Sequence, residues 1–324
     1  IDGESITDEC LKLLFSMVFQ PRLENGVFCA DDVESEKRLL AERLIAENSD
    51  KRTYAKNRCV EIMFENELYG IHRYGTVEAI EKITPEALYE AYNEVLNNGK
   101  ILVCVSGGNF SNVEKLLAEY TSNKNRNIEL NETLYVEECE DSKYVKEQEA
   151  VKQGKLVMGF RMGMKSEDDN YAARRVMVDL FGGSPHSKLF TVVREKMSLC
   201  YYCGARLLRD KGIIFVQSGI EEENYEKALT EILNQLDIMK KGEFTDEDFN
   251  SSIIALCDAF KGVEDSPVAV CNFYSSQEFD EEIISGEEFA KRISAVTREQ
   301  MIECARKVTV DTVYLLKGEA ENND

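Results

Sequence analysis

The chain repeats itself, and this repeat limits the fold more than any other feature of the sequence. Residues 84–86 read Thr-Pro-Glu ahead of a predicted helix and strand, and residues 297–299 read Thr-Arg-Glu in the same setting. A second match joins residues 28–33 to residues 244–249, and the two offsets are nearly equal, at about 213 and about 216 residues. A constant offset indicates a duplicated module, so we expect two homologous domains within the 324 residues.

Apolar periodicity, capping residues and turn signals predict helices and strands in both halves. In the first half, one buried strand is expected at 101–105, and the helices are expected at 5–19, 31–47, 56–66, 85–96 and 110–120. In the second half, the expected strands are 155–162, 199–207, 213–219 and 313–316, and the expected helices are 169–182, 187–197 and 223–240. The short Asp-Lys-Gly connection after the strand at 199–207 predicts a hairpin.

The repeat also predicts where the domains begin and end. Residues 1–123 are the remainder of an N-terminal domain, the polar and acidic stretch 124–144 is a linker, and residues 145–324 are a C-terminal domain. The helix at 5–19 matches the helix at 223–240, so we expect the first copy to lack roughly 75 residues at its start. The expected fold class is α+β, an α/β sandwich in which each domain has a mixed, mainly antiparallel sheet covered by helices.

Charge and composition disfavour some partners. The chain has 61 acidic and 39 basic residues, and its net charge of −22 argues against nucleic acid and anionic membrane surfaces and suits basic peptides. No apolar run reaches the roughly 18 residues that span a bilayer. The ten cysteines are dispersed through a chain large enough to fold without disulfides, which predicts reduced thiols and a cytoplasmic location.

The most specific pattern lies at residues 182–201. A Gly-Gly-Ser turn is followed by Ser-Lys-Leu-Phe and then by Arg194, Leu199 and Tyr201. This pattern resembles the C-terminal domain of the pitrilysin, insulinase and mitochondrial-processing-peptidase family. Three segments resemble the end of that family's N-terminal domain, namely residues 72–75, 84–86 and 106–108. The resemblance covers essentially the whole chain and is strongest to the bacterial zinc-dependent-protease-like branch that lacks the metal motif.

The resemblance implies zinc for active relatives, which bind it through His-x-x-Glu-His and a glutamate on a later helix. Here the two histidines, His72 and His186, lie about 114 positions apart and form no such motif. At the later helix, Glu36 is followed by Arg43 where the ligand is expected, and the adjacent Glu42 is turned by about 100°. We expect no metal and no catalytic residue in this chain, unless the alignment shifts to Glu42. Zinc would come only from a partner or from the missing N-terminal segment.

The family's second domain supplies an arginine and a tyrosine that hold the bound peptide, and the resemblance places these roles on Arg194 and Tyr201. A guanidinium donates to peptide carbonyls, and a phenolic hydroxyl binds polar groups or an oxyanion. The alternative is that Arg194 pairs with an acid on its own helix and Tyr201 packs within a strand. The nearby pair Cys200 and Cys203 is interpreted as structural, because in a strand these two side chains are expected to point to opposite faces.

The sequence leaves three functions open. The first is a non-catalytic subunit of a zinc endopeptidase, which pairs with a paralogous metal-bearing subunit, or with itself, and uses Arg194 and Tyr201 to bind peptide. The second is a scaffold that binds peptides or proteins without hydrolysis. The third is a complete peptidase whose catalytic segment precedes residue 1.

Overall fold

A computed structural model describes residues 6–107, 112–121, 136, 138–139, 141–164, 170–278, 280 and 282–318. Its contacts divide the chain into two compact units. The first unit comprises residues 1–46, 74–132 and 265–278, and the second comprises residues 47–73, 133–264 and 279–324. The second unit therefore takes residues 47–73 from the first half of the sequence. The sequence-based domain boundaries, which follow the duplication, group the residues differently and stay a prediction.

The predicted linker at 124–144 falls mostly outside the described residues. The last two positions of the predicted linker, residues 143 and 144, are already part of the strand β3 (Lys143–Glu149). Among the described residues, no helix is both long and apolar enough to cross a membrane.

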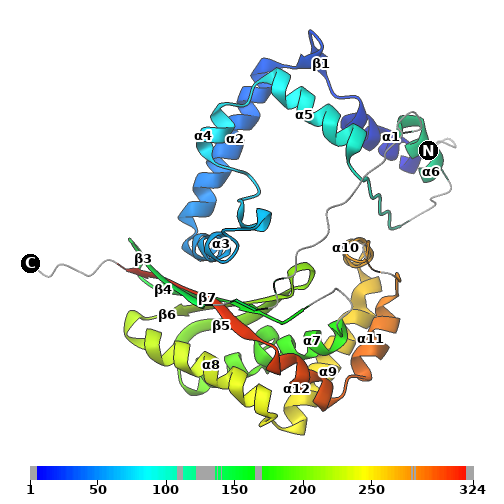
Figure 1. Ribbon diagram of the computed structural model, residues 1–324. Helices are drawn as coiled ribbons and strands as arrows, with labels where there is room; N and C mark the ends of the chain where they lie inside the picture. The colour runs from blue at the N-terminus through cyan, green and yellow to red at the C-terminus, as the bar shows by residue number, and fades with distance from the viewer. Residues whose placement is uncertain are drawn as a thin grey trace, which may run out of the picture. The chain divides into compact units, whose positions relative to one another are not determined.

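The first unit consists mainly of helices (Figure 1). Its elements are α1 (Ile6–Phe19), β1 (Leu23–Glu24), β2 (Val27–Phe28), α2 (Ala30–Ser49, whose last turn belongs to the second unit), α4 (Val77–Glu81), α5 (Pro85–Asn98), α6 (Val113–Thr121) and α10 (Pro267–Ser275). Thr84 caps α5 by accepting a hydrogen bond from the backbone of Ala87, with Pro85 in the first turn as expected. Aromatic rings join α1 to α6, where Tyr120 contacts Phe15 and Phe19.

The strand predicted at 101–105 is wrong. These residues are not paired with any strand in the described part of the chain, and Leu102 is 48% exposed. A strand requires a neighbour for its backbone N–H and C=O groups. The corresponding strand of the second copy has such neighbours on both sides, which is why the same local pattern gives a strand there.

The second unit is a five-stranded mixed sheet with helices on both faces (Figure 1), so the α+β class is confirmed. Its strands are β3, β4 (Gly154–Arg161), β5 (Cys200–Leu208), β6 (Ile213–Ile220) and β7 (Thr309–Gly318). They lie in the order β3-β7-β4-β6-β5, with β3 parallel to β7 and all other pairs antiparallel. The hairpin predicted between β5 and β6 is confirmed, and it turns through η4 (Arg209–Lys211) and the left-handed Gly212.

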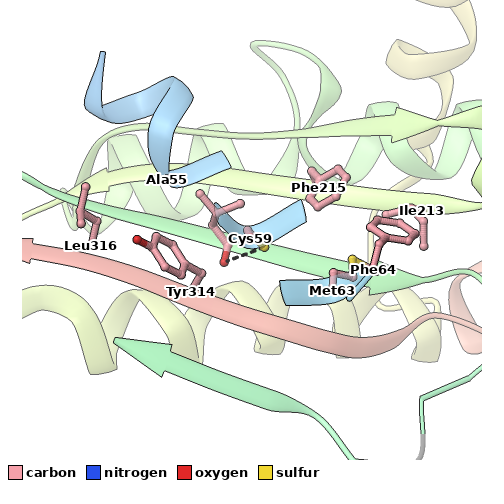
Figure 2. Packing of buried hydrophobic residues seen from close by; sticks show 9 residues of the cluster. Ala55, Cys59, Met63, Phe64, Ile213, Phe215, Tyr314 and Leu316 are labelled. Atoms are coloured by element: carbon pink, nitrogen blue, oxygen red, sulfur yellow. Dashed lines mark hydrogen bonds between the residues drawn. The ribbon is translucent and has the colours of Figure 1, made fainter. Parts of the chain in front are cut away.

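One face of the sheet is covered by α3 (Lys51–Met63), which comes from the first half of the sequence. Ala55, Cys59 and Met63 point from this helix onto the strands, where Phe215 and Tyr314 complete the buried cluster (Figure 2). The helix is close enough that a Cβ on Gly159 of β4 would lie 2.5 Å from the Met63 sulfur. Glycine at this position therefore allows α3 to approach the sheet.

The opposite face is covered by helices of the second half, among them α7 and α8 (Figure 1). Besides η4 and α10, the helical elements of this half are α7 (Tyr171–Val178), η2 (Asp179–Gly183), η3 (Leu189–Lys196), η5 (Glu222–Asn224), α8 (Tyr225–Lys241), α9 (Asp246–Lys261), η6 (Gly262–Asp265, whose last residue belongs to the first unit), α11 (Gly286–Ser294) and α12 (Arg298–Arg306). Phe160 of β4 contacts Phe181 edge to face on this side. Because both faces are covered, β4 is buried along almost its whole length.

A buried ionic network joins the segment after α3 to the sheet. Arg161 of β4 donates through Nε to Asp311 Oδ2 of β7 at 2.8 Å, and the two side chains are 5% and 4% exposed. Glu67 lies 3.4 Å from Arg161 Nη1 and accepts a hydrogen bond from Lys211 at 2.9 Å. Glu67 precedes η1 (Leu68–Gly70), so this network fixes the η1 segment beside the sheet.

Candidate functional site

Arg194 lies exposed near the end of η3, a segment wound as a π-helix. Its guanidinium lies over the ring of Phe190, 4.4 Å from the centroid. Among the described residues, it forms no ion pair with a carboxylate. The alternative that Arg194 is neutralised by an acid on its own helix therefore finds no partner in the described part of the chain.

Tyr201 is 60% exposed at the start of β5. The strand has a β-bulge here, because Cys200 pairs with Ile220 while Tyr202 pairs with Gly219. A bulge leaves one residue without a cross-strand partner and redirects its side chain. The Tyr201 hydroxyl donates to Glu221 Oε1 at 2.6 Å, and this hydrogen bond raises the pKa of the phenol.

The structure brings η3 and the beginning of β5 together through the turn at Ser198, which has a left-handed φ of 51°. Cys200 lies between the two predicted substrate-binding residues in the sequence, and the charge of Arg194 affects the pKa of its thiol. Its pKa is lowered to about 7 by a hydrogen bond from Cys203, by another from Ser218 and by the positive charge of Arg194. Arg194, at the end of η3, and Tyr201, at the start of β5, thus lie on either side of this turn, and Cys200 lies between them in the sequence.

The prediction that Cys200 and Cys203 point to opposite faces is wrong, and the bulge is the reason. Cys203 pairs with Ser218 and Cys200 pairs with Ile220, which are two positions apart on β6 and share one face of the sheet. The two thiols therefore lie on the same face and hydrogen-bond each other. This hydrogen bond and then burial raise the pKa of Cys203, so the two thiols differ in acidity.

The two histidines are separate and have ordinary local partners. His72 Nε2 lies 3.2 Å from Glu47 and 3.4 Å from Asn57. His186 Nε2 lies 3.2 Å from Asp179 and 3.3 Å from Ser252. Within the described ranges, no group of three or more His, Cys, Asp or Glu residues could hold a metal ion. These residues do not provide the donor set that zinc requires.

The helix α2 contains the residues that the sequence analysis compared with the zinc-binding glutamate on the later helix of active relatives. Arg43 is exposed, and its guanidinium contacts the hydroxyl and ring of Tyr74. Glu42 is paired with Arg38 at 3.3 Å, and both side chains are more than half exposed. Glu36 is also exposed. Arg43 and Glu42 therefore have partners of their own within the first unit.

Sequence reasoning missed a pocket of about 790 Å³ in the second unit, which we name the α3 pocket. It is lined by residues of α3, of the η1 segment, and of the paired strands β5 and β6. Lys56 and Arg206 contribute cations from sites 150 residues apart in the sequence. Only the position of α3 over the sheet brings them together, and no local motif records that contact.

Known proteins similar to this chain confirm the family resemblance. Residues 82–256 match the family described as the peptidase M16 inactive domain. The chain is 35% identical over 318 residues to the Bacillus subtilis protein named probable inactive metalloprotease YmfF, covering 98% of this chain and 75% of the relative.

Solved structures show the same fold at lower identity. A conserved protein from Enterococcus faecalis has a TM-score of 0.86 at 24% identity, covering 100% of this chain and 77% of that one. The structure of a peptidase M16 inactive domain from Pseudomonas fluorescens has a TM-score of 0.78 at 16% identity, covering 97% and 76% of the two chains. With the family match spanning more than half of the sequence, this chain belongs to the peptidase M16 family, through the domain described as inactive.

Proposed function

We propose that this chain is a non-catalytic M16 protein that binds peptides through Arg194 and Tyr201 and assembles with a metal-bearing subunit of the same family. The observation that carries the proposal is the exposure of both side chains at one end of β5, where Arg194 has no carboxylate partner among the described residues. A cation without a carboxylate partner in the described part of the chain is well placed to bind a ligand, since the chain as a whole has a net charge of −22.

The chemistry of the pair suits a peptide backbone. The Arg194 guanidinium offers fixed N–H donors that match peptide carbonyls. The Tyr201 hydroxyl already donates to Glu221, so the lone pairs of its oxygen are available to accept a peptide N–H. Together the two side chains present a donor and an acceptor, as an extended backbone requires.

A non-catalytic role is supported by the residues found where a metal-dependent hydrolase of this family would have its metal ligands. The described residues gather no metal-binding set, and Arg43 occupies the position at which the family resemblance predicts a glutamate. Hydrolysis of a bound peptide then requires catalytic groups from outside the described residues, and in this proposal a paralogous, metal-bearing partner supplies them. A homodimer would bind peptide without cutting it.

A cytoplasmic location is part of the same proposal. All ten cysteines are free thiols in the structure, and five of them are buried. Thiols persist in a reducing compartment, where glutathione and thioredoxin keep them reduced.

The test measures peptide binding and peptide cleavage separately. Binding of a fluorescein-labelled basic peptide is followed by fluorescence anisotropy, and cleavage is followed after mixing the chain with its metal-bearing paralogue. Arg194→Ala removes a charged donor, and we expect Kd to rise about tenfold, with a smaller rise for Tyr201→Phe. Cleavage by the mixture at low peptide concentration should fall in proportion.

Two matched variants serve as controls. Lys196→Ala removes an exposed cation from the same helical segment, and Tyr144→Phe removes the hydroxyl of a tyrosine that is 57% exposed on β3. Neither should change Kd. Arg194→Ala and Tyr201→Phe variants that bind and support cleavage like the original chain would refute the proposal.

A further inference from the structure

The α3 pocket lies entirely within the second unit and is separate from the Arg194 and Tyr201 pair. It is lined on one side by α3 and the η1 segment, and on the other by the last residues of β5 and the paired part of β6. Its volume of about 790 Å³ is in the range of sites that hold small ligands. The sheet residue Phe215 lines it and also belongs to the buried cluster beneath α3 (Figure 2).

The pocket contains more positive charge than its carboxylates neutralise. Glu47 is engaged by His72 and Arg73, each at 3.2 Å, and Glu61 is engaged by Arg58, which also binds another acid. Lys56 and Arg206 remain, and within the described part of the chain neither forms an ion pair.

These cations destabilise one another. Lys56 is partly buried, and its pKa is lowered by desolvation and then by the nearby charges of Arg73 and Arg206. Like charges gathered in a partly desolvated pocket cost free energy unless an anion compensates them. In a chain whose overall charge is strongly negative, a local excess of cations calls for a specific cause.

The remaining wall of the pocket is apolar. Leu68 and Ile71 of the η1 segment are 82% and 67% exposed, and Val60, Leu208 and Phe215 lie nearby on the helix and strands. The pocket therefore has an apolar part, formed by the exposed leucine and isoleucine, next to a positively charged part. The matching ligand carries a carboxylate and an apolar side chain close together, as the C-terminal residue of a peptide does.

We propose that the α3 pocket binds the C-terminal carboxylate of a peptide whose last residue is apolar, with Lys56 and Arg206 holding the carboxylate and Leu68 and Ile71 contacting the side chain. This inference rests on the proposed peptide-binding function, because it assigns the pocket to one end of that peptide. Tyr201 and Arg206 lie five positions apart on β5, a distance of about 17 Å, which a short extended peptide spans.

The direct test uses N-acetyl-leucine, the smallest probe with both features, and ligand-observed NMR. N-acetyl-leucine should bind the whole chain, and N-acetyl-leucinamide, which lacks the negative charge, should bind at least tenfold more weakly. Lys56→Met and Arg206→Met should each weaken N-acetyl-leucine binding about tenfold, since each removes a charge-assisted hydrogen bond. Lys227→Met, at an exposed position on α8, is the matched control and should have no effect.

Three results would overturn the inference. One is equal affinity for the acid and the amide, and another is unchanged binding in both pocket variants. The third is inorganic phosphate binding as tightly as N-acetyl-leucine, because the apolar wall would then play no part. The inference and the proposed function fail separately, since Arg194→Ala should leave N-acetyl-leucine binding unchanged while it weakens binding of the long peptide.

Discussion

Replacing Asp311 by asparagine should strongly destabilise the second unit. Asp311 is 4% exposed at its side chain and accepts a hydrogen bond from Arg161, which is equally buried. Asparagine keeps the volume but removes the negative charge, so the guanidinium stays buried beside a neutral amide. Breaking one partner of a buried pair costs about 3–5 kcal/mol. Because Glu67 still lies 3.4 Å from Arg161, we expect the lower end, about 3 kcal/mol.

The chain has no tryptophan whose fluorescence could follow unfolding, and it has two units, so the loss of stability must also be assigned to the second unit. Urea unfolding followed by far-UV circular dichroism gives the midpoint, which should fall by about 1 M for a loss of this size. Hydrogen exchange of peptides from β4 and β7 then assigns the loss to the sheet.

A double substitution tests the reason for the effect. Arg161→Met with Asp311→Leu removes both charges, and we expect it to be less destabilising than Asp311→Asn alone, because no buried charge is left without its partner. The reasoning is refuted by an Asp311→Asn variant that loses less than about 1 kcal/mol, or by single substitutions whose costs simply add in the double variant.

Two further predictions concern pH and thiol chemistry. Hydrogen bonds from Arg58 and Tyr314 lower the pKa of Glu147, so its contribution to stability is complete above the ordinary value of 4.5 and is lost as pH falls through the lower folded-state value. Urea midpoints of Glu147→Gln should therefore lie below those of the original chain at pH 7 and converge with them in acid; a constant gap would contradict this. Cys200, with a pKa of about 7, should be alkylated by iodoacetamide much faster than Cys203 at neutral pH, and mass spectrometry that finds equal rates would exclude the hydrogen-bonded pair.

The parts of the fold that depend on neighbouring residues followed from the sequence. Thr84 with Pro85 begins α5, and Thr297 begins α12, through contacts within one turn, and both helix starts appear where the pattern indicated. The hairpin between β5 and β6 also formed as predicted, because its turn chemistry is local.

The parts that failed depend on partners far away in the sequence. Residues 101–105 have a strand pattern, but no described strand lies beside them. The bulge at Cys200 is set by the register against β6, so alternation along β5 alone gave the wrong faces for the two thiols. The α3 pocket could not be found from local patterns either, because Lys56 and Arg206 meet only after α3 packs on the sheet.

The strand order has a consequence for how the protein is made. β7 is the last described strand along the chain, yet it lies between β3 and β4 near the middle of the sheet. During synthesis on the ribosome, more than 150 residues are therefore added after β3 before β7 emerges, and β7 is the strand that pairs with β3 among the described residues. The second unit cannot complete its sheet until β7 has emerged, and until then the exposed backbone edges of β3 and β4 are open to pairing with other chains.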